Sequence, residues 1–117
     1  MDIAEAQRFA HDWVSAWNDH DLDAILSHYA PDIVFRSPRI RDVTGADVDF
    51  VTGHDALRAY WGQALSTMRD LYFAVDRIYL GAHALTLVYT NHRQQSVAET
   101  FVFGPDGKVR ESIATYS

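Results

Sequence analysis

The stretch from Ala10 to Pro38, "AHDWVSAWNDHDLDAILSHYAPDIVFRSP", contains two helix patterns and the start of a strand. Apolar residues recur at three- and four-residue steps over residues 3 to about 18, which predicts an amphipathic helix. Asp21 can cap a second helix, because its carboxylate can accept backbone N–H bonds that the first turn leaves open. Pro31 removes a backbone donor and disfavours further helix, so a strand is expected from Ile33.

Outside this stretch the patterns are simpler. Residues 38–53 contain glycines among mixed charges and are expected to form a long loop, with one short strand near 48–51. Thr52 is a candidate cap for a third helix, whose apolar face covers 57–68. β-branched and aromatic segments predict four strands, at 72–80, 84–93, 97–103 and 108–116. Helices followed by a run of strands indicate an α+β fold, with helices on one face of a curved antiparallel sheet.

Composition narrows the classes of function. A chain of 117 residues fits a single domain, 1–117, and 48% hydrophobic residues are enough to fold it. Sixteen acidic and ten basic residues give a net charge of −6, so no nucleic-acid partner is expected. The absence of cysteine excludes disulfides and zinc–thiolate sites. No apolar run approaches the roughly 20 residues that span a bilayer, so we expect no membrane partner and a cytoplasmic location.

The stretch 10–38 and the segment "GPDGKVRESIATYS" (104–117) resemble the start and the last hairpin of ketosteroid isomerases, members of the nuclear transport factor 2-like superfamily. The resemblance implies a cone-shaped α+β fold, in which three N-terminal helices pack on the concave face of a curved, mostly antiparallel sheet. Limonene epoxide hydrolase, scytalone dehydratase and SnoaL-like cyclases share this cone. The resemblance therefore predicts a fold and leaves the activity open.

Carried over residue by residue, the resemblance argues against ketosteroid isomerisation. The position of the family's catalytic aspartate is Ser37, and that of its oxyanion-hole tyrosine is Trp13. Its second oxyanion donor, a protonated carboxylic acid, corresponds to Glu99. Because a serine hydroxyl does not remove a carbon-bound proton at neutral pH, this activity is not expected.

Glu99 is the principal candidate for an acid–base group. Among apolar neighbours on an inward face, its carboxyl would be desolvated and its neutral form favoured. A strand shifted by one residue would instead make it a surface acid. Tyr29, Ser37 and His92 are further catalytic candidates, and it stays open whether Asn91 or His92 faces the cavity. The predicted pocket-lining residues are Trp13, Trp17, Phe35, Tyr60, Trp61, Phe101, Ser112 and Tyr116, although aromatic side chains at such spacing also serve as core.

No metal-binding or cofactor-binding motif is present. The sequence contains no His-x-x-x-His pair and no glycine-rich phosphate loop, so neither a metal nor a cofactor is expected. His54 stands at a helix start beside Asp55, where capping or solvation is the common role.

Two functions stay open at this point. One is a SnoaL-like small-molecule-binding protein that acts, without a cofactor, as a lyase, isomerase or hydrolase on an apolar or aromatic compound. The alternative is a non-catalytic domain that binds a hydrophobic ligand, dimerises or binds a partner protein. The resemblance also implies a homodimer formed through the outer sheet face, at Thr86, Val88, Thr90, Ala98, Thr100 and Val102. Arg36, next to Phe35, is expected to point to that outer side or to solvent.

Overall fold

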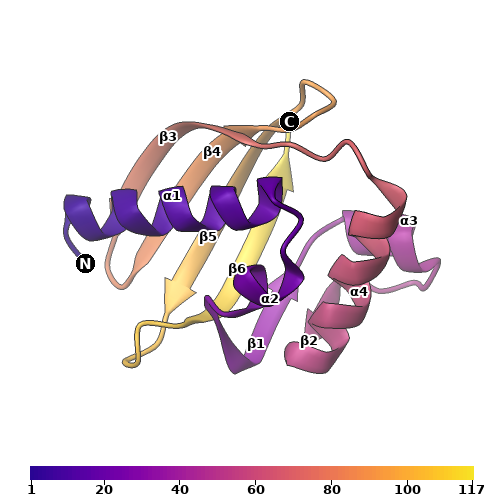
Figure 1. The fold of residues 1–117 in the computed structure, drawn as a ribbon. Coiled ribbons are helices and arrows are strands. Elements are labelled where there is room, and N and C mark those ends of the chain that lie inside the picture. Colours follow the sequence, from indigo (N-terminus) through magenta and orange to yellow (C-terminus); the bar gives the residue numbers. More distant parts are fainter.

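A computed structural model describes residues 1–117 as four helices and a six-stranded sheet (Figure 1). The helices are α1 (Ile3–Asn18), α2 (Leu22–Leu26), α3 (Arg39–Thr44) and α4 (His54–Thr67). The strands are β1 (Tyr29–Arg36), β2 (Phe50–Thr52), β3 (Ala74–Gly81), β4 (Ala84–Thr90), β5 (Ser96–Phe103) and β6 (Val109–Tyr116). The predicted α+β fold is confirmed.

The sheet has the order β2-β1-β6-β5-β4-β3. All neighbouring strands are antiparallel except β1 and β6, which run parallel and place Phe35 opposite Ser112. Figure 1 shows α1 lying across the face formed by β3 to β5, while α4 lies near β1 and β2. Helices therefore cover one face of the curved sheet (Figure 1). None of the helices is both long enough and apolar enough to cross a membrane.

The first two helices begin where the sequence indicates. Asp2 and Glu5 form a reciprocal capping box at the start of α1, each side chain accepting the other's backbone N–H. The Asp21 carboxylate accepts the Ala24 N–H at 3.1 Å, which confirms Asp21 as the cap of α2. The predicted face of α1 is buried, and Trp13 and Trp17 lie on it.

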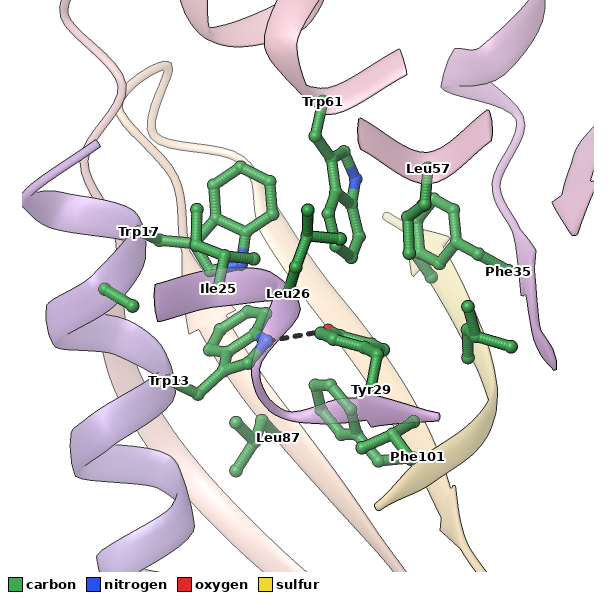
Figure 2. Close-up of a cluster of buried hydrophobic side chains, with 14 of the residues drawn as sticks. Trp13, Trp17, Ile25, Leu26, Tyr29, Phe35, Leu57, Trp61, Leu87 and Phe101 are labelled. Carbon is green, nitrogen blue, oxygen red and sulfur yellow. Dashed lines mark hydrogen bonds between the residues drawn. The ribbon is translucent and has the colours of Figure 1, made fainter. Parts of the chain in front are cut away.

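The core occupies the concave side of the sheet. Alternate residues of β4 and β5 point inward, so that Leu87 and Phe101 are fully buried beneath α1. Figure 2 shows Trp13 beside Tyr29 in this cluster, with its indole N–H donating to the Tyr29 hydroxyl at 2.9 Å. The rings of Trp13 and Phe101 meet edge to face, with centroids 5.3 Å apart. Aromatic side chains thus fill much of the space between the helices and the sheet.

Three expectations about the middle of the chain were wrong. The segment 38–53 contains the expected short strand as β2, but it is not otherwise a loop, because residues 39–44 form α3, whose Ile40 is fully buried. The cone therefore carries four helices where three were expected. Gly53 precedes α4 as its cap residue with φ of 84°, a conformation that glycine tolerates best, so Thr52 is not the cap. Strand β1 begins at Tyr29, before Pro31, and its register with β6 is irregular there.

The outer face of the sheet is half-exposed. Arg36 lies on this face, as expected, and its guanidinium binds the Glu111 carboxylate at 2.8 Å. The hydroxyls of Thr86 and Thr100 lie 2.8 Å apart on the same face. Homodimerisation through this face stays a prediction.

Asn18 joins the end of α1 to the segment that enters β3. Its side-chain amide donates to the Phe73 carbonyl at 2.9 Å and accepts the Phe73 N–H at 2.7 Å. We expect Asn18→Ala to lower the free energy of unfolding by about 1–3 kcal/mol, because both backbone groups of Phe73 lose their partner. Urea denaturation followed by circular dichroism measures this loss. His11→Ala, an exposed position on α1, is the control, and an equal effect of both variants would contradict the role of Asn18.

Candidate functional site

A cavity of about 370 Å³ lies between the helices and the concave face of the sheet. Trp13 and Trp17 of α1, Phe35 of β1, and Tyr60 and Trp61 of α4 form its aromatic walls. In Figure 2, Trp61 from α4 and Trp17 from α1 approach one another, and their ring centroids are 5.1 Å apart. The polar groups of the cavity come from α3 and α4, from β5, from the end of β6 and from the residues that follow β4. Aromatic and polar side chains together therefore line the cavity.

Glu99 is the buried acid of this cavity. It alternates inward with Val97 and Phe101 on β5, and its side chain is only 3% exposed. The Tyr89 hydroxyl donates to one carboxyl oxygen and the Ser112 hydroxyl to the other, each at 2.9 Å. Burial raises the pKa of Glu99 from 4.5 to about 7, against the lowering effect of these two hydrogen bonds. Burial therefore favours the protonated form of the carboxyl group more than in water.

Two phenols at the cavity stay protonated. Tyr60 and Tyr116 both line it. Burial raises the pKa of Tyr60, and burial together with the nearby charge of Glu99 raises the pKa of Tyr116. Both hydroxyls can consequently donate hydrogen bonds at neutral pH.

Arg39 brings a positive charge to the cavity from the start of α3. Its guanidinium carbon lies 4.8 Å from the centre of the Tyr116 ring, and its Nη2 donates to the side-chain oxygen of Gln95. The same oxygen accepts a hydrogen bond from Asn91 at 3.3 Å. The guanidinium is thus held in place by an aromatic face and by the turn between β4 and β5.

The predicted site residues fall into two groups. One group lines the cavity: Trp13, Trp17, Phe35, Tyr60, Trp61, His92, Glu99 and Tyr116. The other group lies outside the cavity lining, and it consists of Tyr29, Ser37, Phe101 and Ser112.

Each residue of the second group has a partner in the protein. Tyr29 accepts the indole N–H of Trp13, Ser112 supports Glu99, and Phe101 is fully buried core. Ser37 is buried, and its hydroxyl accepts the backbone N–H of Arg39 at 3.1 Å. The structure therefore gives these residues supporting positions around the cavity.

Of the two histidines considered as site residues, one lines the cavity and one does not. His54 lies outside the cavity, with its Nε2 2.7 Å from the carbonyl oxygen of Tyr29. Asn91 and His92 both line the cavity, which resolves their placement at the end of β4. No group of three or more His, Asp or Glu side chains lies close enough together to hold a metal ion.

Sequence reasoning missed two contributors, Tyr89 and Arg39. Tyr89 pairs across the strands with Val97, one alternation step from Glu99, so strict alternation along β4 could have identified it. Arg39 lies in a segment without apolar periodicity, where no local signal indicated that its side chain turns toward the cavity.

Two buried nitrogen atoms at the cavity have no hydrogen-bond partner within the protein. They are Nε1 of Trp17, whose side chain is 5% exposed, and Nδ1 of His92. The other ring nitrogen of His92 lies 3.8 Å from the Asp70 carboxylate. Buried donors are nearly always paired in folded proteins, so the unpaired Trp17 N–H is an exception.

The SnoaL-like domain family matches residues 10–112. A SnoaL-like protein of unknown function from Burkholderia thailandensis is 37% identical, with a TM-score of 0.94 over 99% of this chain and 97% of that one. SalBIII, an epoxide hydrolase/cyclase-like enzyme in pyran ring formation in the polyether salinomycin, is 13% identical, with a TM-score of 0.78 over 99% and 93% of the chains. TerC, co-crystallised with polyporic acid, is also 13% identical, with a TM-score of 0.78 over 96% and 91%. No protein of curated function matches the sequence.

Proposed function

Since the chain belongs to the SnoaL-like domain family, we propose that it binds an apolar or aromatic small molecule in the cavity and moves a proton on it, with Glu99 as the acid–base group. The observation that carries this proposal is a carboxyl group buried among aromatic rings, with its pKa raised to about 7. Two proteins of the same fold give support: SalBIII acts in pyran ring formation, and TerC was co-crystallised with polyporic acid.

The residues present suit a proton transfer next to a carbonyl group. Ionised Glu99 can accept a proton from a carbon atom adjacent to the carbonyl, and the protonated carboxyl can return it to another atom of the same molecule. The negative charge that develops on the carbonyl oxygen needs neutral donors, which the phenols of Tyr60 and Tyr116 provide. Tyr89 and Ser112 hold the carboxyl group in position. Isomerisation, elimination or ring closure by this route requires no cofactor.

The alternative is a binding protein without turnover. It is favoured by Ser37, which stands where the related isomerases carry an aspartate and which binds the backbone of Arg39. The indole N–H of Trp13 is likewise engaged by Tyr29 and is not available to a ligand. Glu99 is then the single carboxyl group buried at the cavity.

Deuterium exchange into an aromatic ketone separates the two functions. We expect the protein in D₂O to accelerate exchange of the hydrogens next to the carbonyl of 2-tetralone, with a pH profile centred near 7. Glu99→Gln is expected to slow this exchange by about 100-fold or more, because the amide cannot carry the proton. The readout is the decay of the corresponding proton signals in the NMR spectrum.

Glu111→Gln is the matched control, because Glu111 is exposed on the opposite side of β6 and pairs with Arg36. Exchange that is equally fast in Glu99→Gln and in the wild-type protein would end the acid–base role. Binding of 2-tetralone without any exchange would support the alternative function.

A further inference from the structure

Three arginines of the chain form salt bridges, and Arg39 is not one of them. Arg36, Arg41 and Arg58 each lie within 4 Å of a carboxylate oxygen, whereas Arg39 makes no salt bridge. Arg39 is nevertheless half-buried and lines the cavity. In a chain with a net charge of −6, a half-buried guanidinium without an acidic partner is available to an anion from outside.

The guanidinium is also positioned in advance. The Tyr116 ring supports one of its faces, and Gln95 takes only one of its five N–H donors. Holding the side chain before binding reduces the conformational entropy that a ligand would otherwise have to overcome.

Glu99 and Arg39 line the same cavity, but they form no salt bridge, and the Glu99 carboxyl group is bound by Tyr89 and Ser112. Arg93 is a second cation of the lining, and the Asp42 carboxylate of α3 also borders the cavity without forming a salt bridge. The Nε2 atom of His92 lies 3.8 Å from the Asp70 carboxylate.

An unpaired donor also lies in the wall of the same cavity. The indole N–H of Trp17 is buried in the cavity wall and has no acceptor in the protein. Leaving such a donor unpaired carries a cost in free energy. A pure hydrocarbon in the cavity would leave the guanidinium of Arg39 without an anionic partner.

We propose that the ligand of this cavity is an aromatic anion, whose ring system lies among Trp13, Trp17 and Trp61 and whose anionic oxygen group binds the guanidinium of Arg39. This inference rests on the proposed function for the location of the site, and it adds the charge of the substrate. Arg39 is then the residue that selects for charge, while Glu99 acts on the part of the molecule enclosed by the aromatic walls.

A matched pair of fluorescent probes tests the inference. 8-Anilinonaphthalene-1-sulfonate and N-phenyl-1-naphthylamine share one ring system and differ in the sulfonate group. We expect Arg39→Gln to weaken binding of the sulfonate probe by about tenfold or more, because a charged hydrogen-bond partner is lost. Binding of the neutral probe is expected to stay within about twofold, since the aromatic walls are unchanged. Arg41→Gln, on the same helix but outside the cavity, should change neither affinity.

The outcomes separate this inference from the proposed function. Equal weakening of both probes by Arg39→Gln would overturn charge selection and would give Arg39 a purely structural role at the Tyr116 ring. An unchanged affinity for the sulfonate probe would also overturn it. Failure of the wild-type protein to bind either probe would contradict the aromatic-ligand site itself, and with it both proposals. Thermal unfolding of each variant confirms that the folded protein is being measured.

Discussion

Glu99→Gln is expected to be more stable than the wild-type protein at pH 8, by about 3 kcal/mol, and nearly equal to it in stability at pH 4.5. Burial raises the pKa of Glu99 from 4.5 to about 7. Between pH 4.5 and about 7, Glu99 holds a proton in the folded chain and releases it in the unfolded chain. The free energy of unfolding therefore falls as the pH rises toward and through 7. A shift of this size corresponds to about 3 kcal/mol. Urea denaturation of both proteins at several pH values measures the difference.

Glutamine can replace the carboxyl group without leaving a buried polar atom unpaired. Its carbonyl oxygen can accept from Tyr89, and its amide can donate to the Ser112 hydroxyl. Glu111→Gln serves as the control, and it should change stability by less than about 1 kcal/mol, because it removes only a surface ion pair. If the wild-type protein were equally stable at pH 5 and pH 8, the buried carboxyl group would not titrate as described. Glu99→Gln is thus expected to lose the acid–base group and to be more stable than the wild-type protein at pH 8.

Trp13→Ala is expected to lower the free energy of unfolding by about 3–5 kcal/mol, because it opens a cavity at the centre of the core. The Trp13 side chain is 1% exposed and touches the rings of Phe73, Tyr89 and Phe101. The Tyr29 hydroxyl also loses the indole N–H that it accepts. Such a loss is a large fraction of the stability of a typical domain, about 5–15 kcal/mol. Urea denaturation followed by far-ultraviolet circular dichroism is the measurement.

Tyr72→Ala controls for the removal of an aromatic ring. Tyr72 is 60% exposed, so its loss should change stability by about 0.5 kcal/mol or less. A loss below about 1 kcal/mol in Trp13→Ala would show that the cavity collapses around the smaller residue and that Trp13 does not anchor the core.

Elements with a strong repeating pattern could be predicted from the sequence. The spacing of Trp13 and Trp17 gave the buried face of α1, and the carboxylate of Asp21 gave the start of α2, because both signals are local. Helix α3 was missed because a single buried apolar residue, Ile40, fixes it against the rest of the fold. Its burial depends on tertiary contacts that no short window of sequence contains.

The part of the site that could be predicted is the part in which strand alternation determines which side chains point toward the core. Alternation places Glu99 on the inward face of β5, whereas the raised pKa depends on the walls that other elements supply. The contact of Arg39 with Gln95 joins residues 56 positions apart, and the ring of Tyr116 comes from the last strand. Such groups meet only through the topology of the sheet, which explains why Arg39 gave no signal.

The parallel pairing of β1 with β6 has a consequence for folding during synthesis. Phe35 lies opposite Ser112, so β1 has no partner on this side until nearly 80 further residues have been made. Strands β3, β4 and β5 can pair with one another as hairpins before β1 has its β6 partner. Contacts between such distant segments slow folding, because a long loop must close before they form. During synthesis, β1 can therefore pair only with β2 until β6 has been made, and the sheet becomes continuous only with that last pairing.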